Sequence, residues 1–104
     1  MRIATMGREV RTDTVVVVSQ DQASCDLGKE TVLLHLKTGA YYGLNAVGAR
    51  IWNLIQEPRT VSEVRDAIVG EYDVEPERCE RDVLALLKRL TREGLVEIRD
   101  ESGA

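Results

Sequence analysis

The chain has 104 residues, 43% of them hydrophobic and 31% charged, with a formal net charge of −4 at pH 7. That length allows one domain with one modest core, and the hydrophobic fraction is too high for an intrinsically disordered chain. No apolar run approaches the roughly 20 residues that cross a bilayer, and residues 1–13 lack the apolar block of a secretory signal, so we expect a cytoplasmic protein.

The chain begins with a segment that has no structural pattern and continues with strands. Residues 1–13 mix charged side chains without apolar periodicity, and we expect them to form a flexible tail. Residues 14–18 are all Thr or Val, which favours a short strand, although the lack of alternation leaves its burial open. Residues 23–27 alternate apolar and polar side chains with a period of two, which indicates another strand.

Two further strands follow, each after a turn. A turn at residues 28–30 leads into residues 31–36, and a turn at residues 37–39 leads into residues 40–44. Gly39 supplies the left-handed residue that a three-residue hairpin loop commonly needs. The segments between residues 23 and 44 therefore predict a three-stranded antiparallel meander.

From Asn45 onward the apolar spacing becomes that of helices. Asn45 can cap a first helix, because its side-chain oxygen can accept hydrogen bonds from the free backbone N–H groups, and Pro58 ends that helix. Thr60 and Glu63 have the spacing of a capping box, in which each side chain satisfies the other's backbone N–H. This pair predicts the start of a second helix.

A third helix and a short strand complete the domain. The helix spans residues 75–93, with Pro76 in its first turn and Gly94 as its stop. Residues 95–98 predict the strand, and residues 99–104 a tail. Because the apolar stripes of the helices must cover one another and one face of the meander, residues 14–98 predict a single α+β domain. We expect a winged helix-turn-helix: a three-stranded antiparallel β-meander, three α-helices and a short C-terminal strand.

No catalytic or metal site is evident. His35 is the only histidine, and the apolar alternation of its strand predicts that it faces solvent. Cys25 and Cys79 have neither metal-ligand spacing nor the paired base of a nucleophile, and we expect two ordinary free thiols that are buried or half-buried. No Gly-rich phosphate loop precedes a lysine. We therefore expect a protein that is not an enzyme and that uses no metal and no cofactor.

A winged helix-turn-helix fold raises DNA binding as a rival function. The third helix would be the recognition element, yet it carries as many acidic as basic residues. Such a helix, in a chain of negative net charge, cannot supply the dense cationic surface that holds phosphates. We therefore expect no nucleic acid partner, and a DNA-binding winged-helix regulator stays the alternative.

Three of the four aromatic residues, Tyr41, Tyr42 and Trp52, lie within twelve residues. Trp52 is expected in the core, because the chain has no Phe. Adjacent strand residues point to opposite faces, so at least one tyrosine is expected at a surface, where it either anchors a partner or is simply solvated.

The strand at residues 40–44 is the last one before the helices and is therefore expected at an edge of the meander. It carries neither the charge nor the proline that commonly protects an edge. An uncharged edge beside an amphipathic helix suits an extended peptide that binds as an added strand. The alternative is an edge covered by the chain's own tail.

The most specific stretch of the chain is LLHLKTGAYYGLN at residues 33–45, followed by GARIW at residues 48–52. It resembles the PqqD-like family, the precursor-peptide recognition elements of ribosomally made, modified peptides. The resemblance extends over residues 23–98. Within this group, the Leu-Lys-Thr-Gly turn, the paired tyrosines and the Ile-Trp pair resemble most the small stand-alone leader-binding proteins of lasso-peptide pathways.

The resemblance implies a non-catalytic adaptor that binds the leader segment of a precursor peptide and delivers it to a separate leader peptidase and a macrolactam-forming cyclase. It also implies that the leader adds as a strand beside residues 40–44 and against the third helix. Carried onto this sequence, the peptide-binding residues are Tyr41, Tyr42, Gly43, Leu44, Asp82, Val83, Leu86, Arg89 and Leu90. Family members recruited to quinone-cofactor synthesis serve a radical enzyme instead, and a chaperone role of that type stays open.

Overall fold

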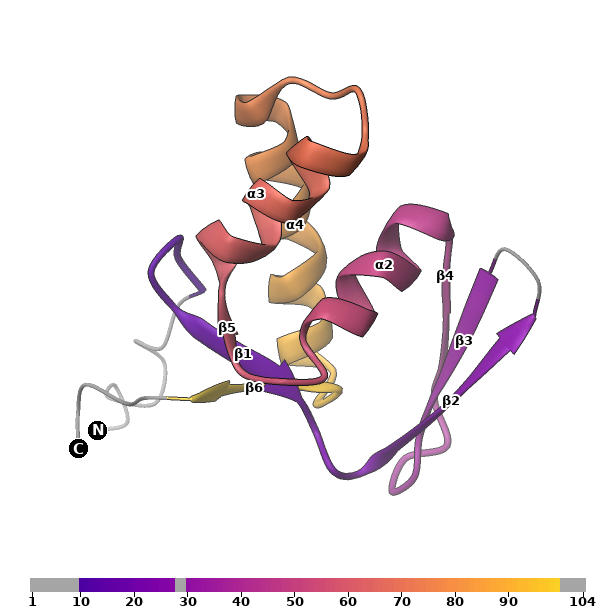
Figure 1. Ribbon diagram of the computed structural model, residues 1–104. Helices are drawn as coiled ribbons and strands as arrows, with labels where there is room; N and C mark the ends of the chain where they lie inside the picture. The colour runs from indigo at the N-terminus through magenta and orange to yellow at the C-terminus, as the bar shows by residue number, and fades with distance from the viewer. Residues whose placement is uncertain (1–9, 28–29, 100–104) are drawn as a thin grey trace, which may run out of the picture.

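The computed structural model describes residues 10–27 and 30–99. These residues form an α+β fold with two antiparallel sheets and three helices, and the sheets lie on either side of α2 (Figure 1). In chain order the elements are β1 (Val15–Val18), β2 (Gln22–Leu27), β3 (Glu30–His35), β4 (Tyr41–Leu44), α2 (Ala46–Leu54), β5 (Arg59–Thr60), α3 (Val61–Glu71), α4 (Pro76–Arg92) and β6 (Val96–Arg99).

The predicted meander is confirmed as the sheet β2-β3-β4. Leu33, at its centre, pairs with Ser24 on β2 and with Tyr42 on β4. The turn before β4 has Gly39 at φ 75°, a left-handed conformation that a residue without a Cβ adopts without a clash. Leu33 and Leu44 lie on the inward face and are 0% and 5% exposed, so this face contributes to the core.

The outward face of the same sheet is apolar and uncovered. Leu34 lies at its centre, between Ala23 of β2 and Tyr41 of β4. Tyr41 is 72% exposed and Leu27, at the end of β2, is 60% exposed. An apolar surface of this kind is more typical of a contact surface than of a purely solvated one.

A second sheet, β5-β1-β6, joins segments from both ends of the chain. β1 pairs with β6 from Val15 opposite Arg99 to Val18 opposite Val96, and its other side pairs with the two-residue β5. The sequence predicts β1 and the C-terminal strand but not their pairing. Val16 and Val17, successive residues of β1, are both buried, so the strand is covered on both faces, which explains why its side chains do not alternate.

The helices begin with the predicted caps. The side chain of Asn45 accepts a hydrogen bond from the Gly48 N–H (2.9 Å) at the start of α2. At the start of α3, Thr60 Oγ1 accepts from the Glu63 N–H and Glu63 Oε1 accepts from the Thr60 N–H, which completes the predicted capping box. α4 has its proline in the first turn and is followed by Gly94 at φ 80°.

One core joins the helices to both sheets. Trp52 of α2 is 2% exposed, which confirms the prediction that it is structural. Ile68 of α3 and Leu87 and Leu90 of α4 are equally buried, and the hydrophobic effect stabilises each such side chain by about 1.5–3 kcal/mol. The mutual burial of these helical stripes holds the helices in place beside the meander.

His35 does not face solvent as predicted. It is 8% exposed and points inward on the same side of β3 as Leu33, whereas Leu36 is 59% exposed. Its Nδ1 accepts the backbone N–H groups of Lys37 (3.2 Å) and Thr38 (3.4 Å). The imidazole thus pairs with donors in the turn, and these hydrogen bonds compensate for its burial.

Val10, the first described residue, is 5% exposed and belongs to the core. The Thr12 carbonyl accepts a hydrogen bond from the Ser62 N–H (3.0 Å) at the start of α3. Residues 10–13 of the expected N-terminal tail, residues 1–13, are thus attached to the domain, whereas residues 1–9 and the C-terminal tail beyond Arg99 lie outside the described residues. No described helix is both long and apolar enough to cross a membrane.

Candidate functional site

β4 is an edge strand, as the sequence predicts. Its only strand neighbour within the described residues is β3. The His35 N–H donates to the Ala40 carbonyl (2.9 Å), and hydrogen-bonded pairs alternate along an antiparallel ladder. In the register that places Tyr42 opposite Leu33, the main-chain groups of Tyr42 and Leu44 are therefore directed at β3. Those of Tyr41 and Gly43 are directed away from it, toward the open edge.

Helix α4 runs beside β4 in the opposite direction. The Arg89 guanidinium carbon lies 5.0 Å from the centre of the Tyr42 ring, close enough for a cation–π contact. Farther along β4, Gly43 and Leu44 lie across an open pocket from Asp82 and Leu86. The start of β4 therefore contacts the last third of α4, and the end of β4 shares the pocket with residues between Arg78 and Leu86 of that helix. We call the pocket together with the Tyr42–Arg89 contact the β4–α4 groove.

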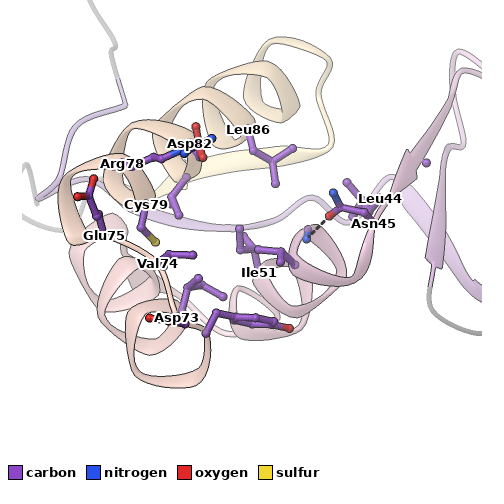
Figure 2. A pocket seen from close by; sticks show the side chains of 16 residues that line it. Leu44, Asn45, Ile51, Asp73, Val74, Glu75, Arg78, Cys79, Asp82 and Leu86 are labelled. Carbon is purple, nitrogen blue, oxygen red and sulfur yellow. Dashed lines mark hydrogen bonds between the residues drawn. The ribbon is translucent and has the colours of Figure 1, made fainter.

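The pocket at the end of β4 has a volume of about 710 Å³. Figure 2 shows Leu86 of α4 and Ile51 of α2 pointing into this space, with Leu44 on its far side. The lining residues are Gly43, Leu44, Asn45, Val47, Gly48, Ile51, Ile68, Tyr72, Asp73, Val74, Glu75, Arg78, Cys79, Asp82, Val83 and Leu86. They come from β4, from all three helices and from the loop between α3 and α4.

The pocket has an apolar floor. Ile51, Ile68, Cys79 and Val83 line it and are 2–5% exposed. Val74, in the loop before α4, is 41% exposed at its mouth. A pocket with such a floor favours an apolar side chain, because burying that side chain removes apolar surface from water on both partners.

The two ends of the groove differ in charge. At the pocket, which we call the loop end, the rim carries Asp73, Glu75, Asp82 and Arg78, all exposed. None of these four makes an ion pair with another described residue. At the other end, which we call the hairpin end, Arg89 lies over Tyr42 and likewise has no ion-pair partner within the described ranges.

Cys79 is the one lining residue with a potentially reactive side chain. It is 5% exposed, and its burial raises the pKa of the thiol, which the nearby Asp82 carboxylate raises further. A thiol with a raised pKa is neutral near pH 7 and is a poor nucleophile. Cys25, by contrast, is exposed, against the expectation of two buried or half-buried thiols. The described residues contain no group of three or more His, Cys, Asp and Glu side chains that could hold a metal.

The residues predicted to bind a peptide take three kinds of position. Five of them line the pocket: Gly43, Leu44, Asp82, Val83 and Leu86. Two others, Tyr42 and Arg89, contact each other at the hairpin end. The last two lie apart from the groove, because Tyr41 is on the outward sheet face and Leu90 is 1% exposed in the core. A role in peptide binding stays a prediction for all nine.

Several lining residues escaped the sequence analysis. Val47, Ile51 and Tyr72 belong to the apolar stripes of the first two helices, and their spacing indicates burial but not which of them borders a cavity. Val74 and Arg78 flank Pro76, whose position signals a helix start. A valine two residues before that proline, outside the apolar stripes of the helices, was the one available signal in the sequence.

Comparisons with known proteins converge on one family. Residues 30–96 match the profile of the family described as coenzyme PQQ synthesis protein D (PqqD). No curated protein matches the chain.

Two solved structures are similar to the whole described domain. The first is TbiB1 in complex with the TbiA(beta) leader peptide, with 41% sequence identity and a TM-score of 0.74 over 82% of this chain and 99% of that one. The second is a lasso peptide synthetase B1 complexed with the leader peptide, with 26% identity and a TM-score of 0.70 over 79% of this chain and 96% of that one. Both relatives were solved with a leader peptide bound.

Proposed function

This chain belongs to the PqqD family, and we propose that it is a non-catalytic adaptor that binds the leader segment of a ribosomally made precursor peptide. The leader adds as a strand at the open edge of β4 and lies in the β4–α4 groove. The arrangement of α2, α3 and α4 beside a β-sheet serves here as a winged helix-turn-helix adapted to hold a peptide.

The observation that carries this proposal is the open edge of β4 beside an apolar pocket. The N–H and C=O groups of Tyr41 and Gly43 point to the open edge of β4. An added strand can form hydrogen bonds with them whether it runs antiparallel or parallel to β4. In strand addition, main-chain bonds supply affinity and neighbouring pockets supply specificity. The groove offers both, and TbiB1, at 41% identity, is a protein that binds a leader peptide.

The wider role is presentation of the leader to other proteins of a lasso-peptide pathway in the cytoplasm. A leader held on β4 brings the attached precursor to a leader peptidase and to a cyclase by raising its local concentration. The raised pKa of Cys79 and its burial in the groove floor support an adaptor rather than a thiol hydrolase. Membership of the PqqD family is also compatible with a second role, in which the chain delivers the precursor peptide to a radical peptide-modifying enzyme.

Calorimetry with the purified protein tests the first part. The titrants are the TbiA(beta) leader peptide and a synthetic leader from the precursor encoded near this chain's own gene, and a scrambled version of each is the control. We expect saturable binding of at least one leader and none of the scrambled peptides. Binding that is equal for leader and scrambled peptides, or absent for both leaders, would contradict the proposal.

A peptidase assay tests the second part. The cognate leader peptidase is incubated with its precursor in the presence and absence of this chain. We expect faster leader cleavage with the adaptor and no cleavage by the adaptor alone. Cleavage of a precursor by this chain without any partner would show that it is an enzyme.

A further inference from the structure

The open edge of β4 cannot by itself decide which way a bound peptide runs. Parallel and antiparallel neighbours both bond to the outward N–H and C=O groups of an edge strand, which here belong to Tyr41 and Gly43. Direction and register must therefore come from side chains along the groove. The groove is suited to this, because its two ends differ in charge.

The loop end is predominantly acidic. Asp73, Glu75 and Asp82 line the pocket together with one cation, Arg78. All four are exposed, so they are hydrated in the free protein and accessible to a peptide. Some surface charges elsewhere on the helices are paired, as in the Arg50–Glu71 contact of 2.8 Å between α2 and α3. The excess of carboxylates at the loop end favours Lys or Arg in the bound peptide.

The hairpin end has the opposite character. Arg89 has no ion-pair partner within the described part of the chain, and its guanidinium lies over the ring of Tyr42. Stacking on an aromatic face leaves the N–H groups at the guanidinium rim available. These donors match a carboxylate, which a guanidinium can bind through two parallel hydrogen bonds.

We propose that the β4–α4 groove selects peptides by charges that complement its two ends. This inference rests on the proposed function and specifies its ligand: an extended segment with an apolar side chain in the pocket, a Lys or Arg beside Asp73, Glu75 and Asp82, and an Asp or Glu beside Arg89. The order of charges fixes the strand direction, because a segment with the exchanged order matches both ends only by running the opposite way. A segment whose two charges have the same sign meets a like charge at one end in either direction and is rejected.

The size of the effect follows from the exposure of these groups. One exposed ion pair contributes roughly 0.2–1 kcal/mol, which is a factor of about 1.5 to 5 in affinity. Replacing one favourable pair by a repulsion of similar size should therefore weaken a peptide by a factor of about 2 to 30. At 1 M ionic strength the screening length is about 3 Å. The difference in affinity between matched and mismatched peptides should therefore largely vanish at that salt concentration.

Selection from a random displayed peptide library tests the proposal with three proteins. These are the wild type, the double variant Glu75→Lys/Asp82→Lys, and the variant Glu77→Lys, which changes an exposed charge on α4 outside the pocket lining. We expect wild type and Glu77→Lys to enrich segments with a basic residue on one side of an apolar residue and an acidic residue on the other. The double variant should lose the basic preference.

Fluorescence anisotropy then compares one enriched peptide with a second peptide in which the basic residue is replaced by Glu, so that both flanking charges are acidic. We expect about tenfold weaker binding of the all-acidic peptide at low salt, near-equal binding at 1 M salt, and partial recovery of the all-acidic peptide by the Glu75→Lys/Asp82→Lys variant. Equal binding of both peptides at low salt overturns the proposal.

A further variant separates this failure from failure of the proposed function. Gly43→Pro removes an outward N–H of β4. If peptides bind the wild type without a preference for charge but bind Gly43→Pro more weakly, the proposed charge selection is wrong and the proposed binding at the edge of β4 stands. Failure to enrich any peptide, or binding that ignores Gly43→Pro, would overturn both.

Discussion

Proline substitution along β4 separates the two sets of main-chain groups in that strand. Proline has no N–H and places a ring where a neighbouring strand would approach. At Tyr41 or Gly43 the lost N–H is the one directed at the open edge, whereas at Tyr42 or Leu44 it is the one directed at β3. The first pair of variants should keep the fold and lose leader binding, and the second pair should lose the fold.

The magnitudes follow from what each N–H contacts. Tyr42→Pro leaves the carbonyl of Leu33, a residue with 0% exposure, without its donor, and an unsatisfied buried polar group costs about 1–3 kcal/mol. Leu44→Pro adds the loss of a core side chain, about 2–5 kcal/mol by analogy with truncation. Since a small domain has about 5–10 kcal/mol in total, these two variants should melt far below wild type. Tyr41→Pro and Gly43→Pro lose no such bond and should cost about 1 kcal/mol or less.

Binding should respond in the opposite way. A main-chain bond to the leader is worth about 0.5–1.5 kcal/mol net, and the ring also blocks approach. We therefore expect Tyr41→Pro and Gly43→Pro to bind at least about tenfold more weakly, or ~1.4 kcal/mol. Calorimetry with a bound leader and thermal melts of all four variants provide the measurements.

Matched controls keep the N–H while changing the side chain. Gly43→Ala is suitable because a Cβ at that position meets no atom within 4 Å, and Tyr41→Ala removes a ring that is 72% exposed. Both should keep the fold, and Gly43→Ala should bind more tightly than Gly43→Pro. Four folded proline variants with wild-type affinity would refute the reasoning, because the leader would then not bind at this edge.

Three further predictions concern other parts of the molecule. Trp52→Ala should lower the free energy of unfolding by roughly 3–5 kcal/mol through the cavity it leaves, and a wild-type denaturation midpoint would show that the ring is not buried. Mass spectrometry of both cysteines during reaction with a thiol reagent at pH 7 should show that Cys25, which is exposed, reacts faster than Cys79, which is buried and has a raised pKa. A bound leader should slow the reaction of Cys79 further. Equal reaction rates of the two thiols would contradict the burial of Cys79 in the pocket floor. Gly94→Ala should lower the free energy of unfolding, measured by chemical denaturation, by about 1–3 kcal/mol, because φ is 80° and the new Cβ would lie 2.9 Å from His35 Nε2. The double variant with His35→Ala should lose less stability than the two single variants together, because the shorter side chain removes that close contact.

The sequence was sufficient for elements whose signals are local. Asn45, the Thr60–Glu63 box and Gly39 each act within a few residues, and each is found in its predicted role. The absence of Phe from the composition also placed Trp52 in the core. The existence of β4 and its position at an edge were likewise predictable from chain order and turn chemistry.

Non-local pairing was not predictable in this way. Four successive valines in β1 do not reveal that this strand pairs with β5 and β6. Because the strand is buried on both faces, it lacks the alternation of apolar and polar side chains that would show which face is buried. The direction of His35 was predicted wrongly, because its pairing with turn N–H groups outweighs its polarity. The contact between Tyr42 and Arg89 depends on how α4 packs, which no local pattern encodes.

The pairing of β1 with β6 has a consequence for protein engineering. Val15 lies opposite Arg99, so the described ends of the chain enter and leave the fold side by side. Figure 1 places this sheet across α2 from β4. A fluorescent reporter, an affinity tag or an enzyme placed next to the β1–β6 pair would therefore lie across α2 from β4. A short linker between the described ends would allow circular permutation, with a new opening between Leu27 and Glu30.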